Sequence, residues 1–421
     1  MKSIWKIIFI AFVLRLAFSF VTWHPDLNNH VDWGIRFWEY GPAKFYKANV
    51  WSFTWPNQPP GTIYIFAGIR KLFELTFSFF WYLNVSIPAF PSNLMLFFEK
   101  NLYQALLKLP AILSDCGIAY LIFRVFAKQG KKTLGLCGAT LFLANPIVWY
   151  NSTIWGQTDS IISFFALLAF VLLIERKFFF AFFAIMLSLY IKLSLIIFLP
   201  VFFVVALKQK YALKQWVIAL LAPILIISVL TIPFSQKAEP FGWLITLYKD
   251  KVFTQQLQVI TANAFNLWAA VAGIHEKPQT LLLGPLQYAQ WGELLLGIAY
   301  LPAIYLVWRK QEIKSVMWSL SIIAFSSFML ATNMHERYLY PLFAPLTILV
   351  CLYSFLLPLY IIVSLVSLVN LYNFWWFPKI DFIVQIMSVK DRIAPRILGL
   401  INFGFFLYFY KQFYTRNFRK G

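Results

Sequence analysis

The chain has 421 residues, of which 61% are hydrophobic and only 12% are charged, and its formal net charge is +20. A soluble domain carries about 25% charged residues, so this composition excludes an ordinary soluble enzyme. The basic residues gather in short loops between apolar blocks, which is typical of cytoplasmic loops in a membrane protein and argues against nucleic-acid binding. The cysteines Cys116, Cys137 and Cys351 fall in apolar stretches without metal-ligand or redox spacing.

Apolar blocks long enough to cross a bilayer follow one another along the chain. The first, residues 4–22, is similar to a signal peptide, but Arg15 interrupts it and no small-residue cleavage site follows. We therefore interpret it as an uncleaved first span with a cytoplasmic N-terminus. The other clear blocks are 61–82, 105–126, 158–174, 215–233, 292–307, 315–333, 338–352, 355–373 and 396–412.

The basic clusters predict which loops face the cytoplasm. These clusters are Lys128–Lys132, Lys208–Lys214, Arg309–Lys314 and Lys411–Lys420. The hydrophilic segments 23–60 and 234–291 are then extracytoplasmic, and 338–421 holds the last spans and a basic cytoplasmic tail. We expect one all-α polytopic unit over residues 1–421, with about thirteen to fourteen transmembrane helices and its functional site on extracytoplasmic loops.

The first half of the chain needs one more crossing than its obvious spans supply. Spans 61–82 and 105–126 alone would leave Lys128 outside. A third crossing through 83–103 would place Lys128 inside, although Pro88 and Pro91 make this stretch a poor helix.

Lys192 interrupts the apolar stretch 178–206, and we expect the helix to break there near the outer surface. A lysine inside a membrane segment is costly and by default indicates a functional site. A lysine that extends from a helix end to the interface is the alternative.

The first outer loop contains Asp26, His30 and Trp33 at positions i, i+4 and i+7, so a short helix would place them on one face. A carboxylate held there in a partly desolvated setting is a candidate general base. The alternative is a solvated loop aspartate. Asp32 and Glu39 are further candidates that periodicity does not exclude.

Two more polar clusters lie next to apolar spans. In the first, His335, Arg337 and Tyr338 precede a span, and the planar fork of arginine suits a phosphate group. A charge cluster that caps a helix at the interface is the alternative. In the second, Gln157 and Asp159 stand at a helix start, where an N-cap is the ordinary role. Neither cluster has metal-ligand spacing, so we expect a reaction without metal or other cofactor.

Five short motifs, taken in order, resemble the GT-C superfamily of polyprenyl-phosphate-sugar-dependent glycosyltransferases, especially bacterial mannosyltransferase-like members. The endoplasmic-reticulum glucosyltransferases that extend the lipid-linked oligosaccharide are more distantly similar. The resemblance covers about residues 1–345. Its motifs are Asp26 with Trp33; Trp55-Pro56-Asn57-Gln58-Pro59-Pro60-Gly61; Lys108-Leu109-Pro110 with Asp115; Asn145-Pro146 with Trp155-Gly156-Gln157-Thr158-Asp159; and Asn263-Ala264-Phe265-Asn266-Leu267-Trp268 with His335-Glu336-Arg337-Tyr338. Asn57 stands where the family usually has an aspartate.

The resemblance implies a GT-C-type helical bundle in the plasma membrane of a bacterium, with an extracytoplasmic active site. It implies an inverting transfer of a hexose, mannose or glucose, from a polyprenyl-phosphate carrier to a hydroxyl of a glycan, lipid or protein acceptor. Asp26 would be the base, and His335, Arg337 and Lys192 would hold the donor phosphate. The residues expected to line the site are His30, Trp33, Asn57, Gln157, Asp159, Asn263, Asn266 and Tyr338. A transporter or flippase, or a polymerase or ligase for lipid-linked saccharides, is the alternative.

Overall fold

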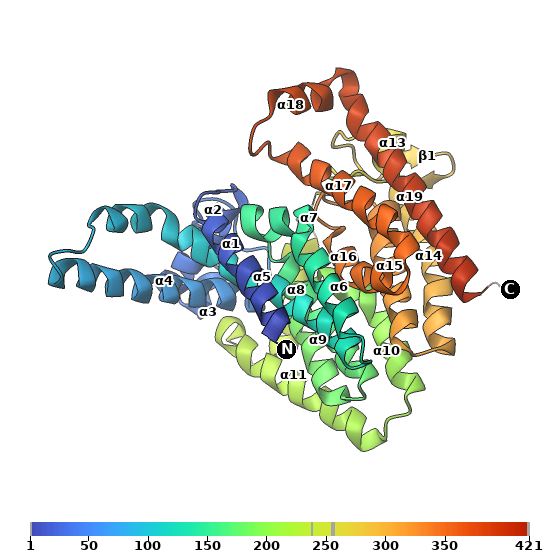
Figure 1. Cartoon of the computed structure of the whole chain (residues 1–421), viewed down its shortest axis with the longest axis horizontal. Helices are drawn as coiled ribbons and strands as arrows, with labels where there is room; N and C mark the ends of the chain where they lie inside the picture. Colours follow the sequence, from blue (N-terminus) through green and yellow to red (C-terminus); the bar gives the residue numbers. More distant parts are fainter. Residues whose placement is uncertain (1, 237–238, 254–256, 419–421) are drawn as a thin grey trace.

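The computed structural model describes residues 2–236, 239–253 and 257–418, and 78% of the chain is helical (Figure 1). In these residues the one sheet is a small antiparallel hairpin of β1 (Leu282–Leu283) and β2 (Leu286–Gln287). The all-α architecture expected from the composition is confirmed.

Six helical segments are long and apolar enough to cross a bilayer. Five of them contain α5 (Asn93–Ala127), α11 (Leu213–Ser235), α14 (Tyr288–Arg309), α15 (Ile313–Leu330) and α17 (Leu357–Phe374). The sixth joins η6 (Lys390–Arg392) to α19 (Ile393–Asn417), and η5 (Ser354–Leu356) precedes α17. Their presence supports a multi-pass membrane protein, because uninterrupted apolar helices of this length match the hydrocarbon thickness.

Several other apolar helices are shorter or broken. The pair α6 (Lys132–Ala144) and Pro146–Trp155 is bent by 53° and would add a seventh span. The shorter segments are α8 (Asp159–Ile174), α9 (Phe178–Ile191), η2 (Leu193–Phe198) with α10 (Leu199–Lys208), and η4 (Tyr340–Leu342) with α16 (Phe343–Leu352). The predicted thirteen to fourteen spans are therefore not confirmed by length and composition in the described part of the chain.

Two local predictions can be compared with helix bounds directly. The break at Lys192 is confirmed, because α9 ends at Ile191 and η2 begins at Leu193. A separate helix over 83–103 is not observed, because α4 (Pro60–Ser86) continues to Ser86 and residues 87–92 connect it to α5. Proline at two positions of this connection prevents one continuous helix.

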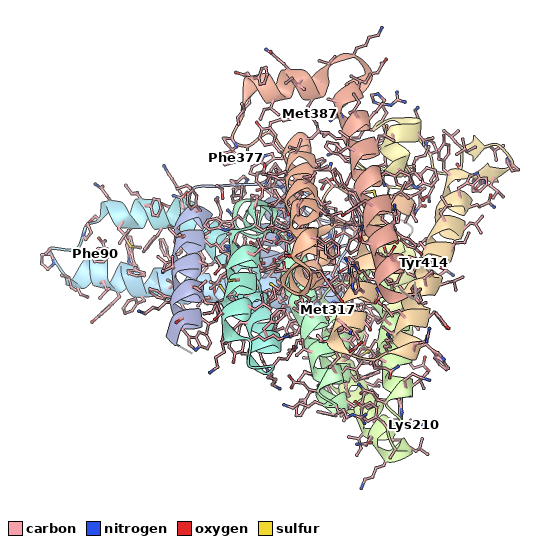
Figure 2. The ribbon with its side chains drawn as sticks, turned by 45° about the vertical axis from the view of Figure 1, so that its right-hand side comes forward. Phe90, Lys210, Met317, Phe377, Met387 and Tyr414 are labelled. Carbon is pink, nitrogen blue, oxygen red and sulfur yellow. The ribbon has the colours of Figure 1, made fainter. Side chains whose placement is uncertain are left out.

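The remaining helices include the first one, α1 (Lys2–Ser19), which is as long as α15. It is followed by α2 (Asp26–Tyr40) and α3 (Pro42–Phe45). The others are α7 (Pro146–Trp149), the π-helix η1 (Tyr150–Trp155), α12 (Pro240–Leu247), η3 (Tyr248–Phe253), α13 (Leu267–Ala272) and α18 (Asp381–Ser388). Helix α2 and α7 lie at one end of the bundle and Lys210 lies at the opposite end (Figures 1 and 2). We refer to these as the α2 end and the basic end.

The basic end is also marked by contacts between loops. Glu175, which follows α8, pairs with Arg124 at 2.8 Å and with Lys128 at 2.6 Å. The loops after α5 and after α8 therefore lie side by side, at the end of α8 that is remote from Asp159.

A buried carboxylate joins the segments that carry the polar clusters. Asp115 of α5 accepts hydrogen bonds from Ser152 (2.5 Å), Ser160 (2.6 Å) and Tyr340 (2.5 Å), and the Arg15 guanidinium lies 3.6 Å away. Because a buried charge is costly unless it is paired and hydrogen-bonded, these contacts hold α1, η1, α8 and η4 together around it.

Candidate functional site

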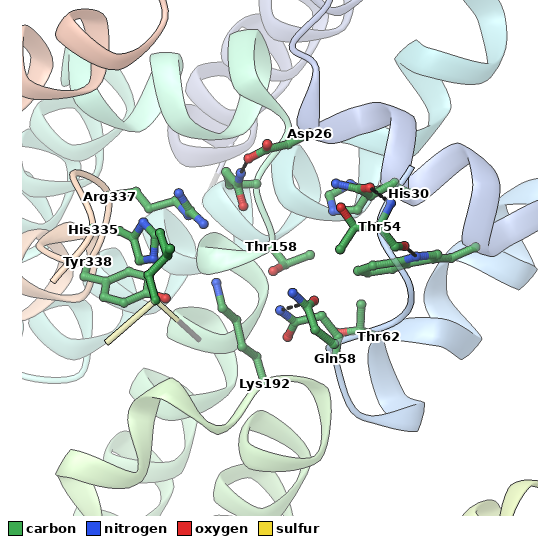
Figure 3. Close-up of a pocket in the computed structure, with 15 residues that line it drawn as sticks. Asp26, His30, Thr54, Gln58, Thr62, Thr158, Lys192, His335, Arg337 and Tyr338 are labelled. Atoms are coloured by element: carbon green, nitrogen blue, oxygen red, sulfur yellow. Dashed lines mark hydrogen bonds between the residues drawn. The ribbon is translucent and has the colours of Figure 1, made fainter. Parts of the chain in front are cut away.

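A polar cavity of about 280 Å³ opens at the α2 end of the bundle (Figure 3). Its walls come from α2, the following loop, the start of α4, the turn before α8, the break at Lys192 and the segment after α15. The lining residues are Asp26, Asn29, His30, Trp33, Thr54, Asn57, Gln58, Thr62, Gln157, Thr158, Lys192, Leu257, His335, Arg337 and Tyr338. The volume is close to the lower end of the range for small-molecule sites, about 300–1,000 Å³.

Asp26, the first residue of α2, is the one carboxylate among these lining residues. Its Oδ2 accepts hydrogen bonds from the Trp155 indole N–H at 3.0 Å and from the Gln157 amide at 2.6 Å. Within the described residues, Oδ1 accepts no hydrogen bond. One oxygen of the carboxylate is therefore held in place while the other is free to accept a proton.

The turn that supplies these two donors follows a π-helix, a form that is frequent at functional sites. The π-helix η1 ends at Trp155, and Gly156 then adopts φ +85°. A Cβ at this position would lie 2.8 Å from Leu27 Cδ2 and 3.0 Å from Lys108 Cγ. Glycine thus allows the backbone to reverse between the two residues that bind Asp26.

The buried side chain of Lys108 fixes the segment that links α1 to α2. The Lys108 ammonium donates to the carbonyl oxygens of Ser19 (3.1 Å) and Thr22 (2.7 Å) and to the Thr22 hydroxyl (2.6 Å). It satisfies carbonyl groups at the C-terminal end of α1, where a positive charge is favoured. Lys108 therefore holds the chain immediately before α2 and its first residue, Asp26.

The surroundings of Asp26 set its protonation state. Burial tends to raise the pKa of this carboxyl, but Arg337, His24 and the Trp155 N–H outweigh burial, and its pKa is lowered. Burial lowers the pKa of His24 to about 3 and that of His30 to about 4. At neutral pH the cavity therefore contains an ionised Asp26 beside neutral imidazoles.

Cationic groups gather on the side of the cavity opposite the neutral residues of α2 (Figure 3). Burial disfavours the charge of Arg337, but Glu336, which binds its Nη1 at 2.6 Å, raises the pKa of the guanidinium. Lys192 donates to Asp159 at 2.8 Å. Burial, with Arg337 and Lys192 nearby, lowers the pKa of His335 to about 3, so this residue can contribute a hydrogen bond but not a charge.

Several polar atoms of this region are buried without a hydrogen-bond partner in the described residues, among them Nδ1 of His30, Nε of Arg337 and Oδ2 of Asp159. Unpaired buried polar atoms are rare in proteins because each costs free energy. His30 and Arg337 line the cavity with other atoms of their side chains, whereas His30 Nδ1 and Arg337 Nε are enclosed by the protein.

A second cavity, of about 220 Å³, adjoins the first and is mainly apolar. The two cavities share Gln58, Lys192 and Tyr338 in their walls. The apolar wall is formed mostly by the residues after the helix break: Leu193, Leu195, Ile196 and Ile197, with Pro59, Ile162 and Met334. The two adjoining cavities could therefore bind a ligand with a polar head and a hydrocarbon tail, the head in the polar cavity and the tail in the apolar one.

Most residues predicted for the site lie in these walls. Asp26, His30, Trp33, Asn57, Gln157, Lys192, His335, Arg337 and Tyr338 line the polar cavity, and Asp159 lines the apolar one. The predicted short helix carrying Asp26, His30 and Trp33 is confirmed as α2.

Asn263 and Asn266 lie outside both linings. Asn266 caps α13 by accepting from the Ala269 N–H at 3.1 Å and donates to the Phe328 carbonyl at 3.1 Å. Backbone bridges join Asn263 and Ala262 to His335. This segment therefore supports the strand-like stretch that bears His335.

The two further carboxylates of α2 also lie outside the linings. Asp32 accepts from the Ser52 N–H at 2.9 Å and from Arg36 at 3.3 Å, and Glu39 pairs with Arg36 at 2.6 Å. Both have structural partners, so Asp26 is the carboxylate of this helix that the cavity can use.

Sequence reasoning did not assign roles to Trp155 or to the polar residues Asn29, Thr54, Gln58 and Thr62. A glycine between an aromatic residue and Gln157 was a signal for a tight turn, but the carboxylate that the turn binds is 129 residues away.

In the described part of the chain, no group of three His, Cys, Asp or Glu residues could hold a metal ion, and metal independence stays a prediction. No protein-family model matches the chain, and no curated protein matches its sequence.

Proposed function

We propose that the chain is a membrane glycosyltransferase that moves a hexose from a polyprenyl-phosphate carrier to an acceptor hydroxyl, with inversion at the anomeric carbon. The observation that carries this proposal is the arrangement around the polar cavity. A held and ionised Asp26 faces Arg337 and Lys192, and an apolar cavity opens beside Lys192.

Asp26 acts as the general base. Its free Oδ1 takes the proton of the acceptor hydroxyl, whose oxygen attacks the anomeric carbon of the donor sugar. A positioned carboxylate contributes typically about 10²–10⁴-fold to such a step. The neutral side chains Asn29, Trp33 and Asn57 supply an aromatic face and amide groups without charge, as expected around an uncharged sugar.

The bond between the anomeric carbon and the phosphate oxygen breaks, and its electron pair leaves with the phosphate. Arg337 and Lys192 hold this group, and an arginine fork binds phosphate through two parallel N–H donors. Their positive charges stabilise the leaving oxygen more strongly as negative charge develops on it. The polyprenyl tail occupies the apolar cavity beyond Lys192 and Tyr338.

The test is a transfer assay with purified protein in lipid vesicles. The donors are synthetic polyprenyl-phosphate mannose and glucose, with the matching diphosphates for comparison, and the acceptors are extracted envelope glycans, lipids and peptides. Products are identified by mass spectrometry, in buffer with and without EDTA. Product from a monophosphate donor supports the proposal, whereas product from the diphosphates alone indicates a polymerase or ligase.

The matched variants are Asp26→Asn and Glu39→Gln. Both neutralise a carboxylate of α2, but Glu39 lies outside the cavity. Asp26→Asn is expected to lose at least a hundredfold in turnover while Glu39→Gln keeps the wild-type rate. Retention of more than about a tenth of the turnover by Asp26→Asn would contradict the role of Asp26 as base.

A further inference from the structure

Helix α4 and the first part of α5 leave the bundle sideways, and their course bears on how the protein sits in the membrane. Figures 1 and 2 show the pair projecting sideways from the central helices, with Phe90 at its tip. The buried side chains of α4 end at Ile69, and apart from Met95 those of α5 begin at Leu102. We refer to residues 70–101 as the arm.

Both roots of the arm lie at the α2 end of the bundle. On α4, Thr62 lines the polar cavity and the Ala67 carbonyl accepts from the indole N–H of Trp38 in α2 at 3.0 Å. On α5, Phe97 stacks on Phe20 at 5.7 Å, just after the end of α1. The chain therefore leaves and re-enters the bundle at the same end.

Helix α5 then reaches the basic end, where Lys128 pairs with Glu175 at 2.6 Å. Between the segment containing Asp26 and the loop containing Lys128, the chain thus passes from one end of the bundle to the other once. Two full crossings by α4 and α5 would return Lys128 to the α2 end, which these contacts exclude.

The charge pattern of the arm agrees with its course. Arg70, Lys71 and Glu74 lie at one root and Glu99 and Lys100 at the other, whereas residues 75–98 contain no charged residue. A turn exposed in the cytoplasm would be expected to carry lysine or arginine, as the loops at the basic end do. The connection 87–92 carries neither.

The surface of the arm is apolar and aromatic. On α4 an exposed row at helical spacing consists of Leu72, Leu75, Phe79 and Tyr82, and Trp81 is also half exposed. The two limbs are joined to each other by the ring pair Phe80–Phe98 at 4.9 Å and by Ser92 donating to Asn84 at 2.9 Å. A helix pair whose exposed side chains are apolar and aromatic, with charges only at its roots, matches the membrane–water interface, where tryptophan and tyrosine are enriched.

We propose that the arm does not cross the bilayer but lies in the lipid leaflet at the α2 end, with its aromatic face among the acyl chains. The loop before the arm and the loop after α5 then lie on opposite sides of the membrane. Since α4 carries Thr62 and packs on α2, immersion of the arm sets the height of the polar cavity relative to the lipid headgroups. This inference does not depend on the chemistry of the cavity.

The first test compares two exposed positions, Asn49 before the arm and Gln129 after α5. Asn49→Cys and Gln129→Cys are made in a chain whose native cysteines are replaced by alanine, and sealed vesicles are treated with a membrane-impermeant maleimide before and after permeabilisation. We expect one of the two cysteines to react in sealed vesicles and the other to react fully only after permeabilisation. Reaction of both from the same side would overturn the proposal.

The second test measures the depth of the tip with a fluorescent bimane label on Ala89→Cys, an exposed position in the connection. Proteoliposomes contain spin-labelled lipids that carry the quencher near the headgroup or near the bilayer centre. The label is expected to be quenched at least twofold more strongly by the shallow quencher, because interfacial helices insert about 5–10 Å. The same label on Gln129→Cys is the control for a water-exposed site. Stronger quenching at the bilayer centre would show a crossing, and no quenching by either lipid would show that lipid does not cover the arm.

Discussion

The indole N–H of Trp155 donates a hydrogen bond of 3.0 Å to Oδ2 of Asp26, although 129 residues separate the two in the chain. Trp155 also stacks on His24 at 4.0 Å, and the Arg337 guanidinium lies over its ring at 5.8 Å. One side chain therefore positions the candidate base and also contacts the cation that would bind the leaving group.

Trp155→Phe should keep the ring contacts while removing the N–H that stabilises ionised Asp26. A hydrogen bond to a charged group contributes about 1.5–3 kcal/mol, or roughly ten- to a hundredfold in turnover. Because the lost donor favoured the charged form, the pKa of Asp26 should rise, and the acid limb of the pH–rate profile should move to higher pH. Trp38→Phe is the control, since Trp38 donates to the Ala67 carbonyl and does not line the cavity. An unchanged profile for Trp155→Phe would remove Trp155 from the positioning of the base.

Gly156→Ala should reduce activity by distorting the turn that carries Trp155 and Gln157. The new Cβ would lie 2.8 Å from Leu27 and would also be strained by the positive φ. Gly130→Ala is a matched control, because Gly130 has φ +76° but no atom within 4 Å of the new Cβ. Both variants should lower the melting temperature through backbone strain of about 1–2 kcal/mol, and only Gly156→Ala should also lower turnover per folded molecule. Equal turnover in the two variants would contradict the proposed role of the turn.

Arg337→Ala should impair use of the donor far more than use of the acceptor. A charge-assisted contact to a leaving phosphate acts in the ground state and more strongly as charge develops, so donor KM should rise and kcat should fall. Arg337→Lys should recover part of the loss, because lysine keeps the charge but lacks the two-donor fork. Kinetics are measured on detergent-purified, folded protein, with the surface variant Arg36→Ala as control. Wild-type donor kinetics with a lower melting temperature would show that Arg337 is only structural.

Lowering the pH from about 7 to 4.5 should destabilise the fold. Burial depresses the pKa of His24 and His335 to about 3 and that of His30 to about 4, whereas an unfolded histidine titrates near pH 6.5. Below pH 6.5 these three histidines therefore bind more protons in the unfolded chain than in the native one, and their contribution to the free energy of unfolding decreases as the pH falls.

The measurement is the melting temperature of the purified protein against pH. His30→Phe should weaken this pH dependence, since it removes one such proton and keeps the ring stacking on Phe66 at 4.1 Å. His275→Asn, at an exposed position, should leave it unchanged. Equal pH dependence in His30→Phe and the wild type would show that His30 is protonated in the fold.

The sequence by itself determined that long segments of this protein are apolar enough for a lipid bilayer and that its secondary structure is helical. Long charge-free blocks predict membrane helices because apolar residues in one run can be buried in lipid without tertiary partners. The break at Lys192 and the helix bearing Asp26, His30 and Trp33 were likewise predictable, because a charge in an apolar run and an i, i+4, i+7 spacing are local signals.

Only the tertiary structure decided which polar residues meet and which helices leave the bundle. The bonds from Trp155 and Gln157 to Asp26 join segments about 130 positions apart, and no local pattern encodes such a pairing. Periodicity did not exclude Asp32 and Glu39, and the family resemblance implied Asn263 and Asn266, yet each of the four lies outside the cavity linings. Hydropathy also cannot distinguish the arm from a helix that crosses the bilayer, because it measures how apolar a segment is and not the direction in which the segment runs. The direction of α4 is set instead by its packing against α2 and α5, through contacts such as Trp38 with Ala67 and Phe73 with Tyr103.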